Sequence, residues 1–307
     1  MRILVVGAGS TGGYFGGRLA QAGRDVTFLV RPARAARLRA DGLRIVSPHG
    51  DAALAPALVE AGSVGGPYDA VLLTVKAFSL DEALRDMAPA VGPGTMILPV
   101  LNGMKHVDAL AERFGPEAVV GCVCKIATQV DAQGRIVQLT PLHFLAYGEM
   151  GGAPSERTAR LDAALRGAGF DALLSPTIAQ DMWEKWIFLA ALGGVTCLMR
   201  GPIGEIAAAP GGRDFALAFL DEVAAVARAA GHPPGEGFLT ETRALLTQEG
   251  SGLTSSMYRD LREQRPVEAD QILGDLLARG RALGVATPLV AAAYAHLSVY
   301  GAGLPGR

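Results

Sequence analysis

The first residues that could do chemistry form a glycine turn near the start of the chain. Gly7-Ala8-Gly9-Ser10-Thr11-Gly12 follows the apolar run Ile3–Val6 and precedes a helical pattern that reaches Ala22. At this spacing the first glycine permits a tight turn, the second lets a pyrophosphate approach the backbone, and the third lets the helix pack on the strand. Free N–H groups at the helix N-terminus then face the phosphates. The order of strand, turn and helix predicts a dinucleotide site, and an ordinary strand-to-helix turn is the alternative.

The residue after the second predicted strand indicates which dinucleotide is bound. The strand Asp25–Val30 ends at Arg31, where an acidic residue would hydrogen-bond the ribose 2′-hydroxyl of NAD. A guanidinium here suits a 2′-phosphate, so the pattern favours NADP(H). Arg34 and Arg37 could add to the same positive field, but we interpret them, with Arg39, as a solvated helix face.

Two ionisable residues in the second half of the chain are candidates for proton transfer. Lys185 lies in the largely apolar segment Met182–Leu189. A lysine among aromatic neighbours loses hydration, which lowers its pKa toward the range where an ammonium donates a proton at neutral pH. A lysine that snorkels from a helix start is the alternative. Glu268 follows Pro266 in a predicted first helical turn, which favours its anion, although a charged helix start explains it as well.

The cysteines and histidines do not predict a metal site. The three cysteines fit a reducing compartment, and Cys122 and Cys124 share one face of a strand-like stretch, where they could bind a metal or oxidise. Because no histidine or second cysteine pair lies at ligand spacing, we interpret them as small apolar residues. The five histidines are dispersed, so no Ser–His–Asp arrangement is predicted either.

The elements that must position these residues change character along the chain. Strand-like runs alternate with alanine-rich helical segments up to about Ser175, and such alternation predicts a parallel, doubly wound sheet. Beyond that point every segment reads as a helix. We therefore expect a Rossmann-type α/β domain over residues 1–175 and an all-α domain over residues 176–307. The expected strands are Ile3–Val6, Val26–Val30, Leu43–Val46, Ala70–Val75, Met96–Val100 and Ala118–Ala127. The expected helices of the second domain are Ile178–Met199, Asp214–Ala230, Leu239–Glu249, Ser256–Gln264, Val267–Leu283 and Pro288–Tyr300.

Composition excludes several classes of protein. The 307 residues carry a formal charge of −2 and the basic residues are scattered, so neither a nucleic-acid nor a membrane surface is predicted. The longest apolar run, Trp186–Met199, is shorter than the ~20 residues of a membrane-spanning helix and predicts a buried core helix. The N-terminal apolar run is interpreted as a strand and not as a secretory signal, so we expect a cytoplasmic protein. The oligomeric state stays open, with a homodimer as one option.

Taken together, these residues resemble the ketopantoate reductase family, which reduces 2-dehydropantoate to pantoate with NADPH in pantothenate biosynthesis. The match is sequential and covers nearly the whole chain. It consists of the glycine turn, Arg31, Thr74-Val75-Lys76-Ala77, Leu101-Asn102-Gly103-Met104, Trp183-Glu184-Lys185, Ser255-Ser256-Met257 with Asp260, and Glu268-Ala269-Asp270.

The resemblance implies a role for each matched residue. Hydride addition to a 2-oxo acid develops negative charge on the C2 oxygen, which a nearby cation must neutralise. Lys185 resembles the general acid for this oxygen, Ser256 a contact to the substrate carboxylate, and Glu268 a partner of the hydroxyl. Residues that resemble ligands of the cofactor, or hold the substrate against its nicotinamide, are Arg31, Lys76, Asn102 and Glu268.

One departure from the family pattern affects the expected substrate. The resemblance implies asparagines four and eight residues after the lysine on one helix face, where this chain has Leu189 and Gly193. This face is therefore expected to be apolar and roomy. Loss of two amides favours either a weaker ketopantoate enzyme or a relative that reduces another 2-oxo acid or oxidises the hydroxy acid. A non-catalytic NADP(H)-binding sensor is the third alternative, although it would not need Lys185 and Glu268.

Overall fold

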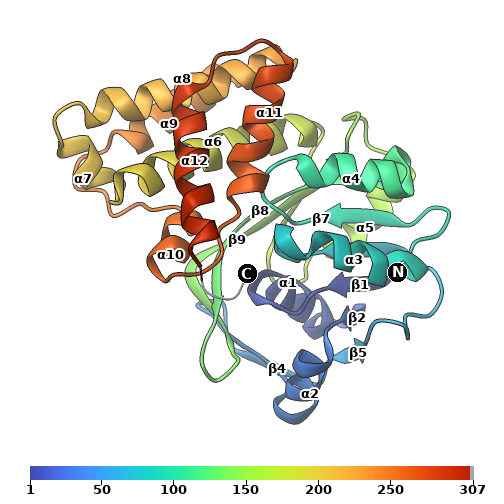
Figure 1. Ribbon diagram of the computed structural model, residues 1–307. Coiled ribbons are helices and arrows are strands. Elements are labelled where there is room, and N and C mark those ends of the chain that lie inside the picture. The colour runs from blue at the N-terminus through green and yellow to red at the C-terminus, as the bar shows by residue number, and fades with distance from the viewer. Residues whose placement is uncertain (305–307) are drawn as a thin grey trace. The chain divides into compact units, whose positions relative to one another are not determined.

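The structure is a computed structural model that describes residues 1–304, and the chain divides into two compact units. The first unit consists of Met1–Leu101 and His106–Ala179, and the second of Asn102–Lys105 and the chain from Gln180 onward. Figure 1 shows the second unit as the yellow-green to red helices. The division falls four residues beyond the expected boundary, and it assigns the short Asn102–Lys105 segment to the helical unit.

The central sheet of the first unit is parallel throughout and has five strands in the order β5-β2-β1-β6-β7. Its strands are short apolar runs, as expected where both faces of a sheet are covered by other elements. They are β1 (Arg2–Val6), β2 (Asp25–Leu29), β5 (Ala57–Val59), β6 (Ala70–Leu73) and β7 (Met96–Pro99). β1 and β6 are neighbours in this order, so the segments that follow these two strands lie at the same edge of the sheet.

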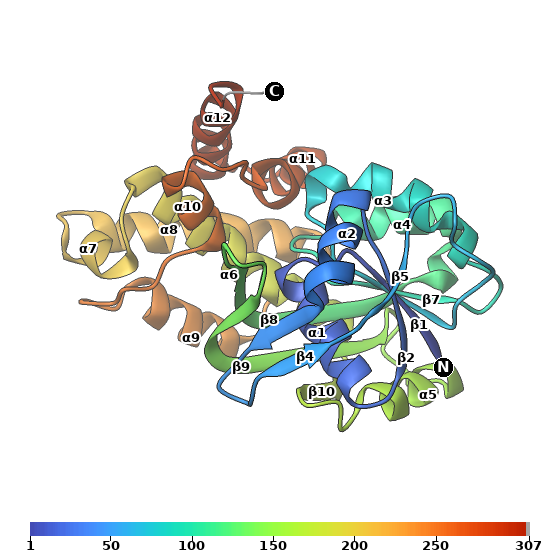
Figure 2. The same ribbon diagram turned by 90° about the horizontal axis from the view of Figure 1, so that it is seen from below.

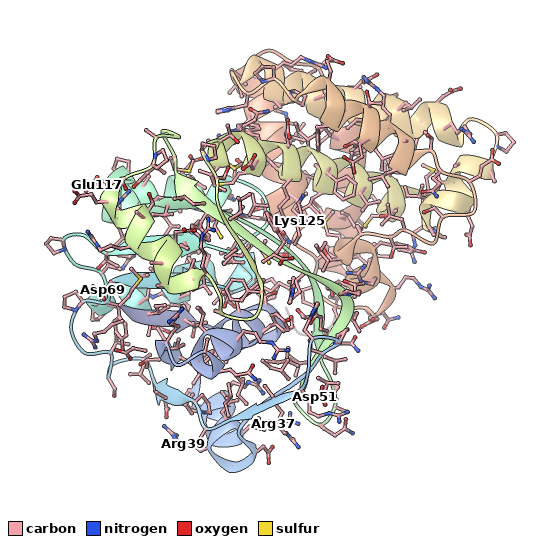
Figure 3. The ribbon with its side chains drawn as sticks, turned by 180° about the vertical axis from the view of Figure 1, so that it is seen from behind. Arg37, Arg39, Asp51, Asp69, Glu117 and Lys125 are labelled. Carbon is pink, nitrogen blue, oxygen red and sulfur yellow. The ribbon has the colours of Figure 1, made fainter. Side chains whose placement is uncertain are left out.

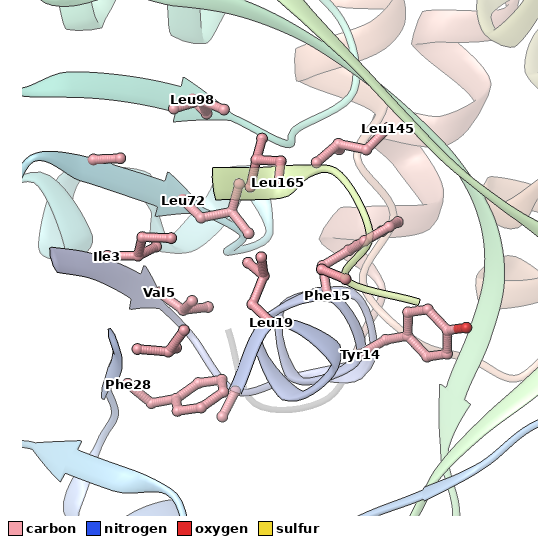
Figure 4. Packing of buried hydrophobic residues seen from close by; sticks show 14 of the residues in the cluster. Ile3, Val5, Tyr14, Phe15, Leu19, Phe28, Leu72, Leu98, Leu145 and Leu165 are labelled. Atoms are coloured by element: carbon pink, nitrogen blue, oxygen red, sulfur yellow. The ribbon is translucent and has the colours of Figure 1, made fainter. Parts of the chain in front are cut away.

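Helices and a second sheet cover the two faces of this sheet. Ile3 and Val5 of β1 belong to one core cluster together with α1 (Ser10–Gln21), whereas Leu4 and Val6 belong to a second cluster on the other face. Figure 4 shows Tyr14, Phe15 and Leu19 of α1 beside the strands. The second cluster includes residues of α3 (Leu80–Met87) and α4 (Lys105–Phe114). The remaining helices of the unit are α2 (Pro32–Asp41) and α5 (Glu156–Leu165).

The second sheet of this unit is mixed and was only partly predicted. Its order is β10-β9-β3-β4, with β8 paired to β9, and Figure 2 shows β8 and β9 as long neighbouring strands. The strands are β3 (Leu43–Val46), β4 (Ala52–Leu54), β8 (Val120–Val130), β9 (Ile136–Glu149) and β10 (Asp171–Leu174). The sequence analysis did not predict β4, β5, β9 or β10. In β9 a stretch of four exposed residues from Leu139 to Leu142 interrupts the buried pattern and hides the strand from periodicity.

The described residues of the second unit form helices and loops without a strand, so both parts of the predicted fold class are confirmed. Its elements are α6 (Ile178–Met199), α7 (Ile203–Ala208), α8 (Gly212–Ala229), α9 (Glu236–Leu246), α10 (Ser256–Arg262), the π-helical turn Asp270–Gly274, α11 (Asp275–Ala282) and α12 (Pro288–Ala302). The predicted single helix Val267–Leu283 is wrong in one respect, because its first part is a π-turn that α11 then continues.

α6 is the one helix within residues 1–304 whose length and composition would let it cross a membrane. Its most apolar 18-residue window has a mean hydropathy of 1.2, and 67% of that window is buried inside the structure. A helix that is apolar on all sides and mostly buried is typical of a protein core.

Candidate functional site

The glycine turn after β1 has the geometry that a dinucleotide requires. Gly7 has φ +95°, a conformation that side chains rarely adopt. A Cβ on Gly12 would lie 2.0 Å from Thr74 Oγ1 and 2.2 Å from Gly7 O, so helix and turn pack too closely for any side chain. A Cβ on Gly9 would meet no atom of residues 1–304 within 4 Å, and its backbone is extended. Packing within the described residues therefore does not explain Gly9, and the open space at its backbone has the form that close approach of a phosphate group would need.

Thr74 fixes this turn from the neighbouring strand, a role that the sequence analysis missed. Its hydroxyl lies 2.8 Å from Val6 O and 2.9 Å from Gly7 O, and its backbone N–H donates to Val6 O at 3.1 Å. Lys76 follows two residues later, is exposed, and precedes a 3₁₀ turn over Ala77–Ser79. These hydrogen bonds join the carboxyl ends of β1 and β6. Lys76 therefore lies at the same end of the sheet as the glycine turn.

The environments of the arginines after β2 differ from those predicted. Arg31 is exposed and forms an ion pair with Glu82, and its guanidinium also donates to Ser79 Oγ at 3.2 Å. Arg34 was interpreted as part of a solvated face, which is wrong. Its Nε donates to Ala8 O within the glycine turn at 3.0 Å, and its Nη2 is buried without a hydrogen-bond partner in the described part of the chain. Burial, followed by the charge of Arg37, lowers the pKa of Arg34.

The other two arginines of α2 agree with the predicted solvated face. Arg37 and Arg39 are exposed, and Figure 3 shows both beside α2 at the outer surface of the first unit. Arg37 donates to Ala132 O at 3.0 Å, and Arg39 pairs with Glu60 at 2.8 Å. Arg34 is therefore the arginine of this helix that contacts the turn, and a spacing of one helical turn from Arg31 is the only sequence signal for it.

In the second unit, three candidate residues lie on segments that meet at the π-turn. Glu268 is buried, with 7% of its surface exposed, and its backbone carbonyl accepts from the N–H of Ile272. The Asn102 carbonyl accepts from Gln271 Nε2 at 2.9 Å. Trp186, directly after the half-buried Lys185, donates its indole N–H to Ile272 O at 2.9 Å. The structure thus brings the segments of Asn102, Lys185 and Glu268 together, and Gln271 was not among the predicted residues.

The apolar face beyond Lys185 is filled at one of its two positions. Leu189 lies one turn further along α6 and is half-buried. Gly193 is buried, and a Cβ placed on it would lie 2.4 Å from Met257 Cε. The expectation of a roomy face is wrong at Gly193, because the Met257 side chain occupies that space. The face is nonetheless apolar at both positions.

The two serines before Met257 have different environments. Ser255 is buried and caps α10, since its Oγ accepts from Tyr258 N at 2.9 Å, and it lies 2.9 Å from Thr196 Oγ1. Ser256 is the first residue of α10 and is half-buried. Its neighbour Met257 lies against α6 at Gly193, so α10 begins close to the helix that carries Lys185 and Leu189.

Cys122 and Cys124 pack in an apolar core cluster, whereas Cys197 lies beside Ser255. Cys122 is buried and Cys124 is half-buried, both in β8. Cys197 is buried in α6, and this burial raises the pKa of its thiol to about 12. Within residues 1–304 no group of three or more histidine, cysteine, aspartate or glutamate side chains could hold a metal ion.

A parallel sheet with a glycine turn at its edge, joined to a helical unit that carries a lysine and a buried glutamate, defines a class: dinucleotide-dependent oxidoreductases. Comparison with known families makes the assignment specific. The family described as "Ketopantoate reductase PanE/ApbA" matches residues 3–152, and its "C terminal" counterpart matches residues 177–301. The chain therefore belongs to the ketopantoate reductase family, which confirms the resemblance found in the sequence.

Individual relatives cover almost the whole chain. The uncharacterised oxidoreductase YkpB of Bacillus subtilis is 36% identical over 300 residues, which are 98% of this chain and 99% of the relative. A 2-dehydropantoate 2-reductase of Mesorhizobium japonicum is 30% identical over 319 residues and covers 96% of both chains. The crystal structure of 2-dehydropantoate 2-reductase from Methylococcus capsulatus has a TM-score of 0.87 at 29% identity, and covers 100% of this chain and 99% of that one. The chain is thus an oxidoreductase of a family that binds a nicotinamide dinucleotide and acts on small keto acids.

Proposed function

We propose that the protein reduces a 2-oxo acid with NADPH, and that 2-dehydropantoate is the first substrate to test. The observation that carries this proposal is that Lys185 and the buried Glu268 lie on segments that meet at residues 268–272. A cofactor-binding sensor would need neither residue. The proposal includes a cytoplasmic location, a role in pantothenate biosynthesis and a homodimer as the assembly to test.

The first unit has the features expected of an NADP(H) site. Gly9 leaves space for the pyrophosphate, and the N–H groups of Ser10 and Thr11 open α1 behind it. Arg31 and Arg34 are the cations proposed for the 2′-phosphate. Because Arg34 has a buried nitrogen without a partner among residues 1–304, a phosphate oxygen would satisfy a group that these residues leave unsatisfied.

The proposed chemistry assigns one task to each polar residue of the second unit. When bound, NADPH supplies the hydride that adds to C2 of the oxo acid. Lys185 donates a proton to the C2 oxygen as its charge develops, and Ser256 hydrogen-bonds the substrate carboxylate. Glu268 accepts from the product hydroxyl. Lys76 and Asn102 hold the reacting groups against the nicotinamide.

A second candidate substrate is a 2-oxo acid with an apolar side chain. Leu189 and the Met257 methyl group at Gly193 give the helix face beyond Lys185 no amide for a hydroxyl. A hydroxyl buried without a partner costs about 1–3 kcal/mol, whereas an alkyl chain loses nothing there. This face therefore favours substrates that lack the terminal hydroxyl of ketopantoate.

Steady-state NADPH oxidation with a panel of 2-oxo acids tests both candidates. We expect turnover with ketopantoate and appreciable turnover with 2-oxo acids of similar size that lack its hydroxyl. The variant Leu189→Asn should shift the ratio of efficiencies toward ketopantoate, while Gly193→Asn would first have to displace Met257. Strong preference of the wild type for ketopantoate over its deoxy analogues would show that other residues bind the hydroxyl. Tight NADPH binding without turnover on any 2-oxo acid would instead support a sensor.

A further inference from the structure

One turn of π-helix in the second unit contacts the segments that carry Lys185 and Asn102, and it also contacts α12. The turn spans Asp270–Gly274, and the N–H of Asp275 donates to Asp270 O, five residues back. A π-turn places one extra residue in a helix, so the carbonyl groups and side chains around it leave the regular α-helical positions. The extra residue changes the direction of the following side chains by a large angle, since each helical residue accounts for ~100° of rotation and ~1.5 Å of rise.

The first contact holds the helix that carries Lys185. Trp186 has 1% of its surface exposed and is the largest fully buried side chain in the described residues. Its indole N–H donates to Ile272 O inside the π-turn at 2.9 Å. The Arg279 guanidinium also lies over its ring, 5.7 Å from the centroid. Because Trp186 directly follows Lys185, its fixed ring also fixes the backbone from which the Lys185 side chain extends.

The second and third contacts hold the segment of Asn102. Gln271 is buried and donates to the Asn102 carbonyl at 2.9 Å, and the next residue, Gly103, has φ +80° and no room for a Cβ beside Gln271 O. Asp270 Oδ2 accepts from Lys105 Nζ at 3.0 Å, and Asp270 Oδ1 accepts from Tyr294 at 2.6 Å. Three successive residues of the turn thus contact α6, the Asn102 loop and α12.

We propose that the π-turn is the positioning element of the site, and that Trp186 and Gln271 are the positioning residues that act through it. The turn begins two residues after Glu268, so the same backbone fixes Glu268, Asn102 and Lys185 relative to one another. A regular α-helix over these residues would rotate Gln271 and the Ile272 carbonyl away from their partners by about 100°. What Lys185 and Glu268 do chemically rests on the proposed function, whereas the positioning itself does not.

The kinetic test uses Trp186→Phe, which removes the N–H donor and keeps an aromatic ring. We expect kcat to fall ~10–100-fold with the KM for NADPH changed less than ~3-fold, because a displaced proton donor affects the chemical step more than cofactor binding. Tyr147→Phe, which removes a hydroxyl that donates to Asp162 at 2.7 Å in the first unit and likewise keeps an aromatic ring, is the control and should change kcat less than ~3-fold. Equal losses in the two variants would overturn the proposal.

Gln271→Leu provides a second variant that keeps a side chain of similar size in a buried position. We expect it to lower kcat ~10-fold, and the double variant Trp186→Phe with Gln271→Leu to lose no more than about the larger single effect. Substitutions that act through one element have effects on the activation free energy that do not add. The fold-losses in kcat of independent substitutions multiply. A double variant whose loss equals the product of the two single losses would overturn the shared role of the turn.

The second readout does not depend on turnover and separates the two proposals. The chain has four lysines, so the NMR spectrum of ¹³C-methylated lysine side chains can be assigned by single substitutions: Lys76, Lys105, Lys125 and Lys185. If the π-turn couples the segments, Trp186→Phe should move the signals of both Lys185 and Lys105, because Lys105 contacts Asp270 at the other end of the turn. Lys76 and Lys125 lie in the first unit and serve as references. An unmoved Lys105 signal would refute the coupling even if the wild type reduced no 2-oxo acid, and moved signals would support it in that same case.

Discussion

Replacement of Arg34 is the most informative test of cofactor choice. Arg34→Met keeps most of the aliphatic part of the side chain and removes the guanidinium, whose Nε donates to Ala8 O and whose Nη2 is buried without a partner among residues 1–304. We expect the wild type to use NADPH at least ~10-fold better than NADH, since a hydrogen bond to a charged group contributes about 1.5–3 kcal/mol. Arg34→Met should remove most of this preference.

Arg31 should contribute less than its sequence position suggests. To contact a phosphate it must leave Glu82, with which it pairs at the surface, where the exposed fractions of the two side chains are 64% and 49%. An exposed ion pair contributes only ~0.2–1 kcal/mol, so this exchange lowers the contribution of Arg31 and does not abolish it. We therefore expect Arg31→Met to lower the NADPH preference by a smaller factor than Arg34→Met.

The assay is the ratio of kcat/KM with NADPH to kcat/KM with NADH in each variant. The ratio isolates the 2′-phosphate, because loss of the Arg34 contact to Ala8 O affects both cofactors alike. Arg39→Met is the control, since Arg39 is exposed and pairs with Glu60, and its ratio should stay within ~2-fold of the wild type. A full loss of preference in Arg31→Met with none in Arg34→Met would refute this reasoning.

Three further predictions concern the glycine turn, the proton donor and acid stability. Gly9→Ala should weaken NADPH binding at least ~10-fold with little change in Tm. Gly12→Ala should also lower the free energy of unfolding by about 1–3 kcal/mol, because its Cβ would lie 2.2 Å from the Gly7 carbonyl oxygen. Calorimetry of the two variants measures this difference. Lys185→Ala should lower kcat ~10²-fold or more while NADPH binding by titration is retained, and loss of affinity with unchanged turnover would make Lys185 a cofactor ligand. The hydrogen bonds from Arg157 lower the pKa of Glu149, so this pair stabilises the fold at neutral pH and its contribution is lost as the pH falls through the lowered pKa. Glu149→Gln should therefore lower Tm by about 2–4 °C at neutral pH and leave it nearly unchanged in strong acid, and an equal loss at both would contradict this.

The sheet that carries the glycine turn could be predicted because its signal is local. β1, β6 and β7 are apolar runs between turns, and burial on both faces explains why no polar residue alternates within them. β9 could not be predicted in the same way. It is buried at both ends and exposed over Leu139–Leu142, so neither a continuous nor an alternating pattern covers its 14 residues.

The roles of the arginines could be predicted only in part, because a sequence shows position and not pairing. Arg31 follows the strand where a ribose ligand is expected, and that inference needs no distant residue. Glu82, which pairs with Arg31 and would compete with a phosphate for it, is 51 positions away in the sequence. The contact of Arg34 with Ala8 spans 26 positions. The spacing of Arg34 one helical turn after Arg31 is a weak local signal for the second contact, and the spacing of charges gives none for the first.

The same limit applies more strongly to the helical unit. The motifs give the identities of Lys185, Asn102 and Glu268, but the hydrogen bonds that fix their segments join residues 86 and 169 positions apart. A π-turn also leaves no periodic signal, since one extra residue within a helix looks like a small shift in an apolar pattern. A change at Trp186 or Gln271 would therefore leave every motif intact and still alter the geometry of the site. For this reason we expect relatives that share the motifs but differ at the residues that contact the π-turn to differ in activity. The effect of such differences should be as large as that of changes in the motifs themselves.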